Sequence, residues 1–150
     1  SPMNDGASAA FIGSEKGGEL LGQDPIARIV SNGAFALEPQ FFGLAPVEAA
    51  NKALVKAGLK WSDIAAVELN EAFAAQSLAC IRAWDIDPAI LNAWGGAIAI
   101  GHPLGASGLR ILGTLARRLA ESGERYGLAA ICIGVGQGLA VVIENVNATK

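Results

Sequence analysis

Short, mostly apolar runs along this chain predict five strands. Each run lacks the three- to four-residue spacing that an amphipathic helix would show. The runs occupy residues 6–14, 28–37, 64–69, 128–133 and 139–144. Asn32 and Gly33 mark a possible β-bulge in the second run, since an asparagine-glycine pair readily leaves the regular strand conformation.

Between these runs, apolar residues recur at helical spacing. The segment that begins at Pro46 predicts a helix, because proline suits a first helical turn and Gly58 suits the C-terminal cap. The same spacing predicts a helix over residues 72–84 and another that ends near Gly123. Residues 15–22 form at most a short helix, and the glycine-rich residues 95–108 predict no regular element. The alternation of strands and helices indicates an α/β fold.

Composition narrows the possible partners and compartments. The chain has 150 residues, enough for one domain, and 52% of them are hydrophobic. Its net charge is −3 and it has no basic tract, so we expect no nucleic-acid partner. No apolar run approaches the ~20 residues that span a bilayer, and the N-terminus lacks a signal pattern. The two cysteines are far apart without metal-ligand spacing, so we expect a cytoplasmic protein with no disulfide and no metal.

The single histidine, His102, lies in the glycine-rich segment GGAIAIGHPLGASG. Glycines permit close backbone approach and Pro103 stiffens the turn, which is typical of an active site. A histidine that only hydrogen-bonds a loop is an equally weighted interpretation. Phosphate binding by the glycines is a weaker one, because the segment lacks a nucleotide-binding pattern.

Three further residues of interest, Cys132, Asn70 and Glu71, stand at strand ends. Cys132 ends an apolar strand before a glycine-rich loop, where its thiol could face a pocket, although free cysteine is more often a small buried hydrophobe. Cys80 lies on a predicted helix and is expected to be such a core thiol. Asn70 and Glu71 fall where a strand meets a helix, a place where open α/β sheets contact ligands, but also where asparagine often caps a helix.

Taken together, these segments closely resemble the three C-terminal motifs of thiolases. The motifs read NEAFAAQ at 70–76, GGAIAIGHPLGASG at 95–108 and CIGVGQG at 132–138. The opening SPMNDGASA at 1–9 is similar to the start of this half in the family. The resemblance covers essentially the whole chain and implies a thiolase-like C-terminal domain over residues 1–150, with a five-stranded mixed sheet flanked by helices.

The resemblance implies a role for each motif residue. His102 would help activate a nucleophilic cysteine and lend its ring nitrogen to an oxyanion hole, and Asn70 would hold the water that completes the hole. Cys132 would be the acid/base at the acetyl-CoA methyl carbon, and the backbone N–H of Gly134 would serve a second oxyanion hole. Four further positions match residues that border the pantetheine or acyl channel: Ser1, Phe42, Ala72 and Phe73.

The family nucleophile has no counterpart here. In thiolases it is a cysteine of the N-terminal half, which the resemblance implies as a partner, together with a homodimer or homotetramer of the full-length protein. The chain is therefore expected to take part in CoA-dependent thiolysis of 3-ketoacyl-CoA, or condensation of acetyl-CoA, and to be inactive alone. CoA thioesters would be substrates, and no cofactor is expected.

Two other functions remain open from the sequence. One is a non-catalytic acyl-CoA binding module that has kept the fold, against which the intact His102, Cys132 and Asn70 argue. The other is a condensing enzyme similar to ketoacyl synthases, in which histidine or asparagine typically stands at the position of Cys132. The acyl chain, whether acetoacetyl, longer 3-ketoacyl or 3-oxoadipyl, is left open.

Overall fold

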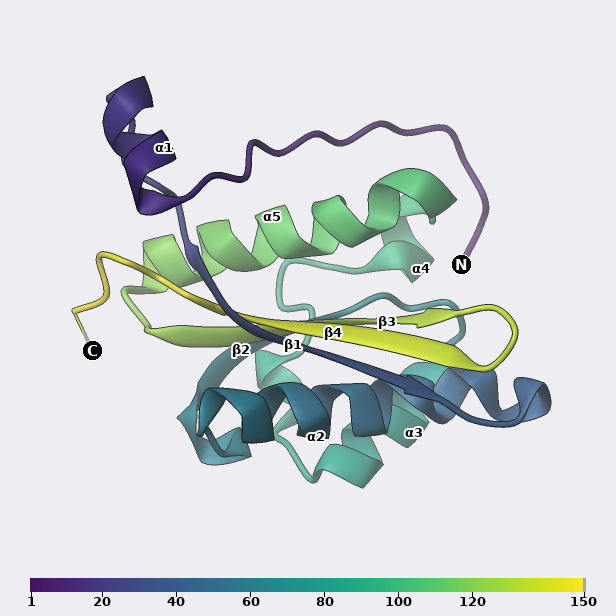
Figure 1. Cartoon of the computed structure of the whole chain (residues 1–150). Helices are drawn as coiled ribbons and strands as arrows, with labels where there is room; N and C mark the ends of the chain where they lie inside the picture. Colours follow the sequence, from purple (N-terminus) through teal and green to yellow (C-terminus); the bar gives the residue numbers. More distant parts are fainter. Residues whose placement is uncertain (150) are drawn as a thin grey trace.

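A four-stranded mixed sheet forms the centre of the computed structural model, which describes residues 1–149 (Figure 1). Its strands, in spatial order, are β1 (Arg28–Ala36), β4 (Gln137–Glu144), β3 (Tyr126–Ile133) and β2 (Ile64–Leu69). The β1/β4 and β4/β3 pairs are antiparallel, whereas β3 and β2 are parallel. The carboxyl ends of β2 and β3 therefore meet at one edge of the sheet.

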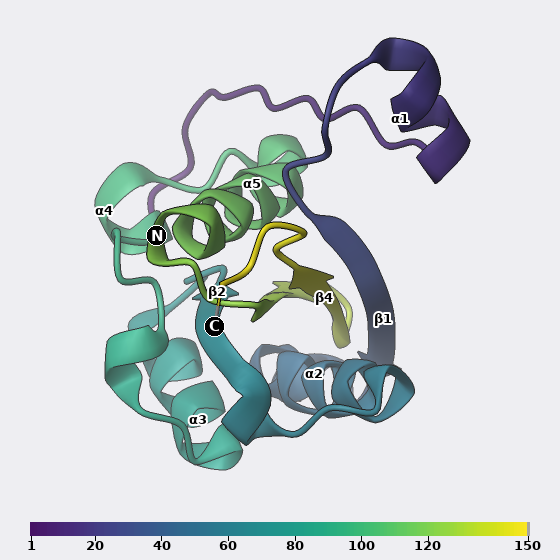
Figure 2. The same cartoon turned by 90° about the vertical axis from the view of Figure 1, so that its left-hand side faces the viewer.

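Helices cover both faces of the sheet, which gives three layers (Figures 1 and 2). Helices α2 (Ala45–Ala57) and α3 (Ala74–Trp84) pack on one face, and α5 (Leu104–Ser122) packs on the other. The remaining helical elements are short: α1 (Glu15–Leu21), η1 (Pro39–Leu44), η2 (Trp61–Asp63), η3 (Pro88–Ile90) and α4 (Ala97–Ile100). Gly58 and Gly123 end α2 and α5 in the left-handed conformation, as the sequence predicted.

The prediction of a fifth strand at residues 6–14 is wrong. Residues 6–14 are extended but exposed and unpaired, and they run past the start of α5, where the Ser8 hydroxyl donates to the Ala106 carbonyl at 2.8 Å. The free edge of β2 is covered instead by a single parallel bridge between Val67 and Leu91. The side chain of Asn92 extends this pairing, because its amide both accepts from the Leu69 N–H and donates to the Leu69 carbonyl, each at 2.9 Å. A side-chain amide thus takes the place of another strand.

Two smaller predictions also need correction. Residues 95–108, expected to be irregular, contain α4 and the first turn of α5. The bulge in β1 lies between Ile29 and Ser31, not at Asn32 and Gly33. Gly33 has a different use, since a Cβ there would come within 2.1 Å of the Ala49 carbonyl oxygen on α2.

Small side chains let α2 approach the sheet closely. Four of its buried positions are fully buried alanines: Ala45, Ala49, Ala50 and Ala53. At the other end of the contact, a Cβ on Gly138 of β4 would meet the Ala45 backbone at 2.4 Å. At these positions α2 and the sheet meet in close van der Waals contact between backbones, beside a core of larger side chains.

A pair of tryptophans closes the same layer. The rings of Trp61 and Trp84 lie 5.1 Å apart between centroids. The Trp61 indole N–H donates to the Asn51 side chain at 3.1 Å, and that of Trp84 donates to the Val47 carbonyl at 3.3 Å. Both acceptors belong to α2, so each indole buries its ring and keeps its polar group satisfied.

The α5 face combines larger apolar residues with buried charge. Ile111, Leu115 and Leu119 form its core contact with the sheet. Arg118 on the same helix is buried and donates to the carboxylate of the fully buried Glu68 at 2.6 Å. Two backbone carbonyls, those of Val67 and Ile90, accept the remaining hydrogen bonds of this guanidinium.

Candidate active site

Asn70 and His102 lie together at the carboxyl end of β2. The Asn70 backbone N–H donates to the Ala130 carbonyl at 2.9 Å, which continues the β2/β3 pairing by one residue. Its fully buried side chain places Nδ2 at 3.3 Å from Nε2 of His102. The structure therefore brings together the two residues predicted to form one oxyanion hole.

The loop before α5 fixes the position of His102. The His102 N–H donates to the Pro2 carbonyl at 2.8 Å, which ties this loop to the start of the chain. Gly101 has φ 95°, and a Cβ there would come within 2.5 Å of the Asn4 side chain. Only glycine fits this position without strain.

Two residues that sequence reasoning missed hold the pair from the other side. The Ser107 hydroxyl is fully buried at 2.6 Å from Nδ1 of His102. Arg110 donates to Oδ1 of Asn70 at 3.3 Å. Ser107 and Arg110 are three residues apart on α5 and so share a helix face, a spacing that would have revealed them had the helix been predicted from Leu104. Arg110 thus places a positive charge beside the Asn70 and His102 pair.

The surroundings of His102 favour its neutral form. Burial lowers the pKa of His102 below its ordinary value of 6.5, and the positive charges of Arg110 and the Ser1 ammonium lower it further. The imidazole is therefore mostly unprotonated at neutral pH, which is the state that can accept a proton.

Cys132 lies at the same sheet edge but is not joined to the histidine. It is 7% exposed and pairs with Gly138 across the β3/β4 hairpin, and its thiol forms no hydrogen bond to another residue among residues 1–149. Burial raises the pKa of its thiol, so the thiol is protonated at neutral pH.

Cys80 is the core thiol that the sequence predicted. It is fully buried on α3, its thiol donates to the Gly43 carbonyl at 3.4 Å, and it accepts from the Gln76 amide. Burial raises its pKa to about 11, which removes it as a nucleophile at neutral pH.

Gly134 opens the tight turn that joins β3 to β4. The next two residues, Val135 and Gly136, both have positive φ, at 67° and 85°. A valine in this conformation is strained, because its branched Cβ crowds the backbone. No atom lies within 4 Å of a Cβ built on Gly134, so a ligand has room to approach its backbone.

The four predicted channel residues form two contacting pairs beside the site. The Ser1 ammonium donates to the Ala72 carbonyl at 2.9 Å. The rings of Phe42 and Phe73 meet edge to face at 6.2 Å. Phe73 is 58% exposed, so an apolar surface lies open immediately after the NEAF segment.

Glu71 anchors the site. Its carboxylate accepts from the Asn92 amide at 2.8 Å and from the Ile98 N–H, at the first turn of α4, at 3.0 Å. A Cβ on Gly96 would come within 2.2 Å of this carboxylate, which explains why a glycine stands there. The motifs at 70–76 and 95–108 are thus held together by Glu71.

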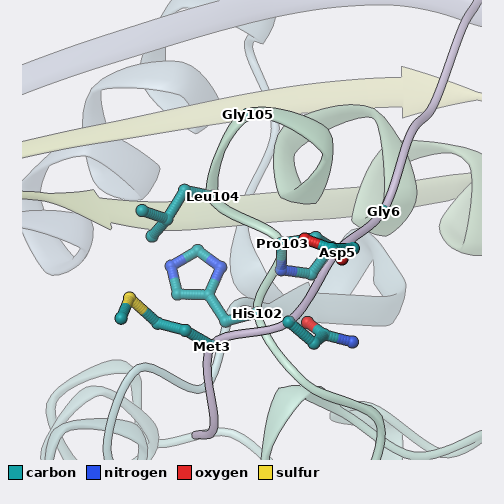
Figure 3. A pocket seen from close by; sticks show the side chains of 8 residues that line it. Met3, Asp5, Gly6, His102, Pro103, Leu104 and Gly105 are labelled. Atoms are coloured by element: carbon teal, nitrogen blue, oxygen red, sulfur yellow. The ribbon is translucent and has the colours of Figure 1, made fainter.

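A shallow pocket opens over the histidine. It has a volume of about 300 Å³ and is lined by residues 3–6 and 102–105. Figure 3 shows the His102 imidazole between the side chains of Met3 and Leu104. Within residues 1–149 no cluster of three or more His, Cys, Asp or Glu side chains could hold a metal ion. The helices of this same part of the chain include none that is long and apolar enough to cross a membrane.

Comparisons with known proteins agree with the motifs. The family model described as "Thiolase, C-terminal domain" matches residues 23–145. Acetyl-CoA acetyltransferase of Shinella zoogloeoides is 49% identical over 97% of this chain and 37% of its own length. The 3-ketoacyl-CoA thiolase of Photorhabdus laumondii is 48% identical over 98% of this chain and 39% of its own length.

Solved structures give the same result for the fold. Human mitochondrial 3-ketoacyl-CoA thiolase superposes with a TM-score of 0.86 at 45% identity, covering 89% of this chain and 34% of that one. A structure of the human enzyme in complex with CoA gives the same TM-score and covers 88% of this chain. The chain spans under two fifths of the length of these relatives. It belongs to the thiolase family and has the fold of the C-terminal domain.

Proposed function

We propose that this chain supplies the C-terminal part of an active site for reversible, CoA-dependent cleavage of 3-ketoacyl-CoA. The observation that carries the proposal is the Asn70 and His102 pair, at 3.3 Å, held at the carboxyl edge of the parallel strands. A binding module has no need for a neutral imidazole set against a buried amide. An enzyme that develops negative charge on a thioester oxygen needs both.

Each of these residues has its own role in the proposed reaction. In the cleavage direction, a cysteine thiol of the N-terminal half gives its proton to Nε2 of His102, and its sulfur bonds to the keto carbon. The carbon–carbon bond then breaks, and the thiol of Cys132 delivers its proton to the departing carbon to form acetyl-CoA. The acyl group left on the N-terminal cysteine then passes to the sulfur of free CoA, whose thiol proton returns to Cys132, while Nε2 of His102 returns its proton to the released cysteine. Burial suits Cys132 to this role, because a raised pKa keeps the proton on sulfur until the carbanion forms. Once protonated, Nε2 of His102 stabilises charge on one oxygen together with the water that Asn70 would hold, and the Gly134 N–H stabilises charge on the other.

The nucleophile must come from outside the described residues. Cys80 is buried with a pKa of about 11, and Cys132 is the proposed acid. Large apolar side chains are exposed near the N-terminus, Phe11 at 78% and Leu20 at 81%, which supports a covering partner. We infer that this partner is the N-terminal thiolase domain, and that the full-length protein is a homodimer or homotetramer. Ser1, Phe42, Ala72 and Phe73 would border the pantetheine arm of the CoA thioester.

Two measurements test the proposal. The chain alone should not cleave acetoacetyl-CoA in the presence of free CoA, and turnover that Cys132→Ser abolishes would instead make Cys132 the nucleophile. In the full-length protein, His102→Asn should lower kcat by a factor of about 10²–10³ while CoA affinity changes little. A collapse of CoA affinity with near-normal kcat would make His102 a binding residue and overturn the assignment.

A matched pair of cysteine variants separates the two thiols. In the full-length protein given acetyl-CoA, Cys132→Ser should leave the acyl-enzyme burst intact and block the later removal of a proton from the methyl carbon of the second acetyl-CoA, so that condensation fails. Cys80→Ser, which alters the other buried thiol, should leave both steps in place once folding is verified. Loss of the burst in Cys132→Ser would assign Cys132 to the acyl-transfer step instead.

A further inference from the structure

A continuous series of hydrogen bonds runs through His102. Arg110 donates to Oδ1 of Asn70 at 3.3 Å, and Nδ2 of Asn70 lies 3.3 Å from Nε2 of His102. On the other side of the ring, Nδ1 lies 2.6 Å from the Ser107 hydroxyl. That hydroxyl in turn donates to the Pro103 carbonyl at 3.4 Å.

The chemistry of a guanidinium gives this series a direction. Arginine can only donate hydrogen bonds, so the Asn70 atom facing Arg110 must be the carbonyl oxygen. The amide nitrogen of Asn70 then faces the histidine and donates to it. The ring atom that receives this bond, Nε2, must carry a lone pair, and the proton of the neutral imidazole must lie on Nδ1, from which it is donated to Ser107.

We propose that Arg110 is a positioning residue that fixes the amide of Asn70 and thereby selects the tautomer of His102 with a lone pair on Nε2. The proposal extends the proposed function, in which Nε2 receives the proton of the nucleophilic thiol. If Asn70 were turned over, its oxygen would face Nε2 and favour a proton there. The imidazole could then accept no proton at the atom that faces the active site.

Burial makes the selection effective. Asn70 and Ser107 are fully buried, so water does not compete for their hydrogen bonds. Nε of Arg110 is also buried, and it has no hydrogen-bond partner within residues 1–149. The contact with Asn70 is therefore the polar anchor of this side chain. The charge of Arg110 also lowers the pKa of His102, second only to burial, which keeps the ring neutral.

The single histidine allows a direct test on the chain itself. We would label the chain with ¹⁵N and record the imidazole nitrogen shifts above the pKa of His102, because the two tautomers give opposite patterns. The wild type should show Nε2 unprotonated. Arg110→Met, which keeps much of the side-chain length but neither charge nor donors, should shift the tautomer ratio roughly tenfold towards the Nε2 proton. It should also raise the pKa of His102.

Arg117→Met is the matched control. Arg117 lies on the same helix but is exposed, so removing it changes the net charge equally without touching Asn70. Its spectrum and titration should match those of the wild type. A protonated Nε2 in the wild type, or an unchanged tautomer in a folded Arg110→Met, would overturn the proposal.

A second variant covers the case in which Arg110→Met does not fold. Asn70→Asp replaces the donor that faces His102 by an acceptor while Arg110 remains. Nε2 should then carry the proton and the pKa of His102 should rise. A lone pair that stays on Nε2 in this variant would equally overturn the proposal. These readings need no turnover, so they are independent of the kinetic result for His102→Asn, which tests the proposed function.

Discussion

The two faces of the sheet are packed by different kinds of residue. On the α2 face, alanines and glycines bring backbones into contact, and Gly33 leaves no space for even a methyl group. On the α5 face, larger apolar residues surround a buried ion pair, and the start of the same helix supplies Ser107 and Arg110 to the site. The α5 face therefore couples the stability of the fold to the position of the histidine.

The largest loss of stability is expected when the buried ion pair on the α5 face loses its cation. Arg118→Met leaves the Glu68 carboxylate without its cation and should lower the free energy of unfolding by about 3–5 kcal/mol. The double variant with Glu68→Gln removes both charges and should recover most of this loss. Urea unfolding followed by circular dichroism measures both. A double variant as unstable as the single one would show that packing, and not charge, holds this face.

The pH dependence of Arg118→Met gives a further check. Burial raises the pKa of Glu68, although Arg118 opposes the shift. A carboxyl whose pKa is higher in the folded than in the unfolded state stabilises the fold below the unfolded pKa, and this contribution is lost as pH rises through the folded pKa. Without Arg118 the folded pKa should rise further. The stability deficit of Arg118→Met should therefore shrink as pH falls below neutral.

Gly33→Ala should disturb the packing of α2 on the opposite face of the sheet. Its Cβ would come within 2.1 Å of the Ala49 carbonyl oxygen, so α2 must move away from β1. We expect a loss of about 2 kcal/mol or more in the free energy of unfolding, because backbone atoms cannot adjust as a flexible side chain can. The imidazole shifts of His102 should not change. A disturbed His102 tautomer in this variant would show that the two faces are coupled.

A smaller effect is expected at the ion pairs between the strand ends. Glu144 accepts from Arg125 at 2.8 Å and from Arg28, but both arginines are more than half exposed. Burial raises the pKa of Glu144, and the hydrogen bonds from the two arginines outweigh it, so the pKa lies below 4.5. Glu144→Gln should cost about 1 kcal/mol at neutral pH. Because the pKa is lower in the folded state, this contribution should disappear as pH falls through it, which acid titration of the two proteins would reveal.

The smallest effect should be a gain. Gly113 lies in the middle of α5, and no atom lies within 4 Å of a Cβ built there. Gly113→Ala should raise the free energy of unfolding by about 0.5–1 kcal/mol, because alanine loses less backbone freedom in a helix. A loss on thermal or urea unfolding would mean that α5 needs a glycine for a reason beyond its own backbone.

The sequence predicted four strands from their short apolar runs, and the major helices from apolar residues that recur at three- and four-residue spacing. It failed at residues 6–14, whose small side chains suit a strand but whose contacts are with the start of α5 and not with the sheet. It also missed the first turn of α5. Gly105 and Gly108 have low helix propensity, but tertiary packing outweighs that preference.

The sequence likewise predicted some residues of the site and missed others. The motifs predicted His102 and Asn70, and the structure joins them. Ser107 was missed because residues 95–108 were expected to be irregular, so the helix face that it shares with Arg110 was not recognised. The predicted roles of Cys132 and Gly134 come from the resemblance. The structure adds that Cys132 is buried and that Gly134 opens the turn between β3 and β4.

The paired tryptophans give the protein a built-in optical reporter. Two of its three tryptophans, Trp61 and Trp84, stack against each other and hydrogen-bond to α2, whereas Trp94 is half exposed. Emission from the stacked indoles will respond first to any movement of α2 away from the sheet, and the solvent-facing indole will respond to quenchers in solution. Stopped-flow fluorescence can thus time the loosening of one layer, while the lone imidazole reports the other by magnetic resonance. No dye or engineered label is needed to learn which layer opens first.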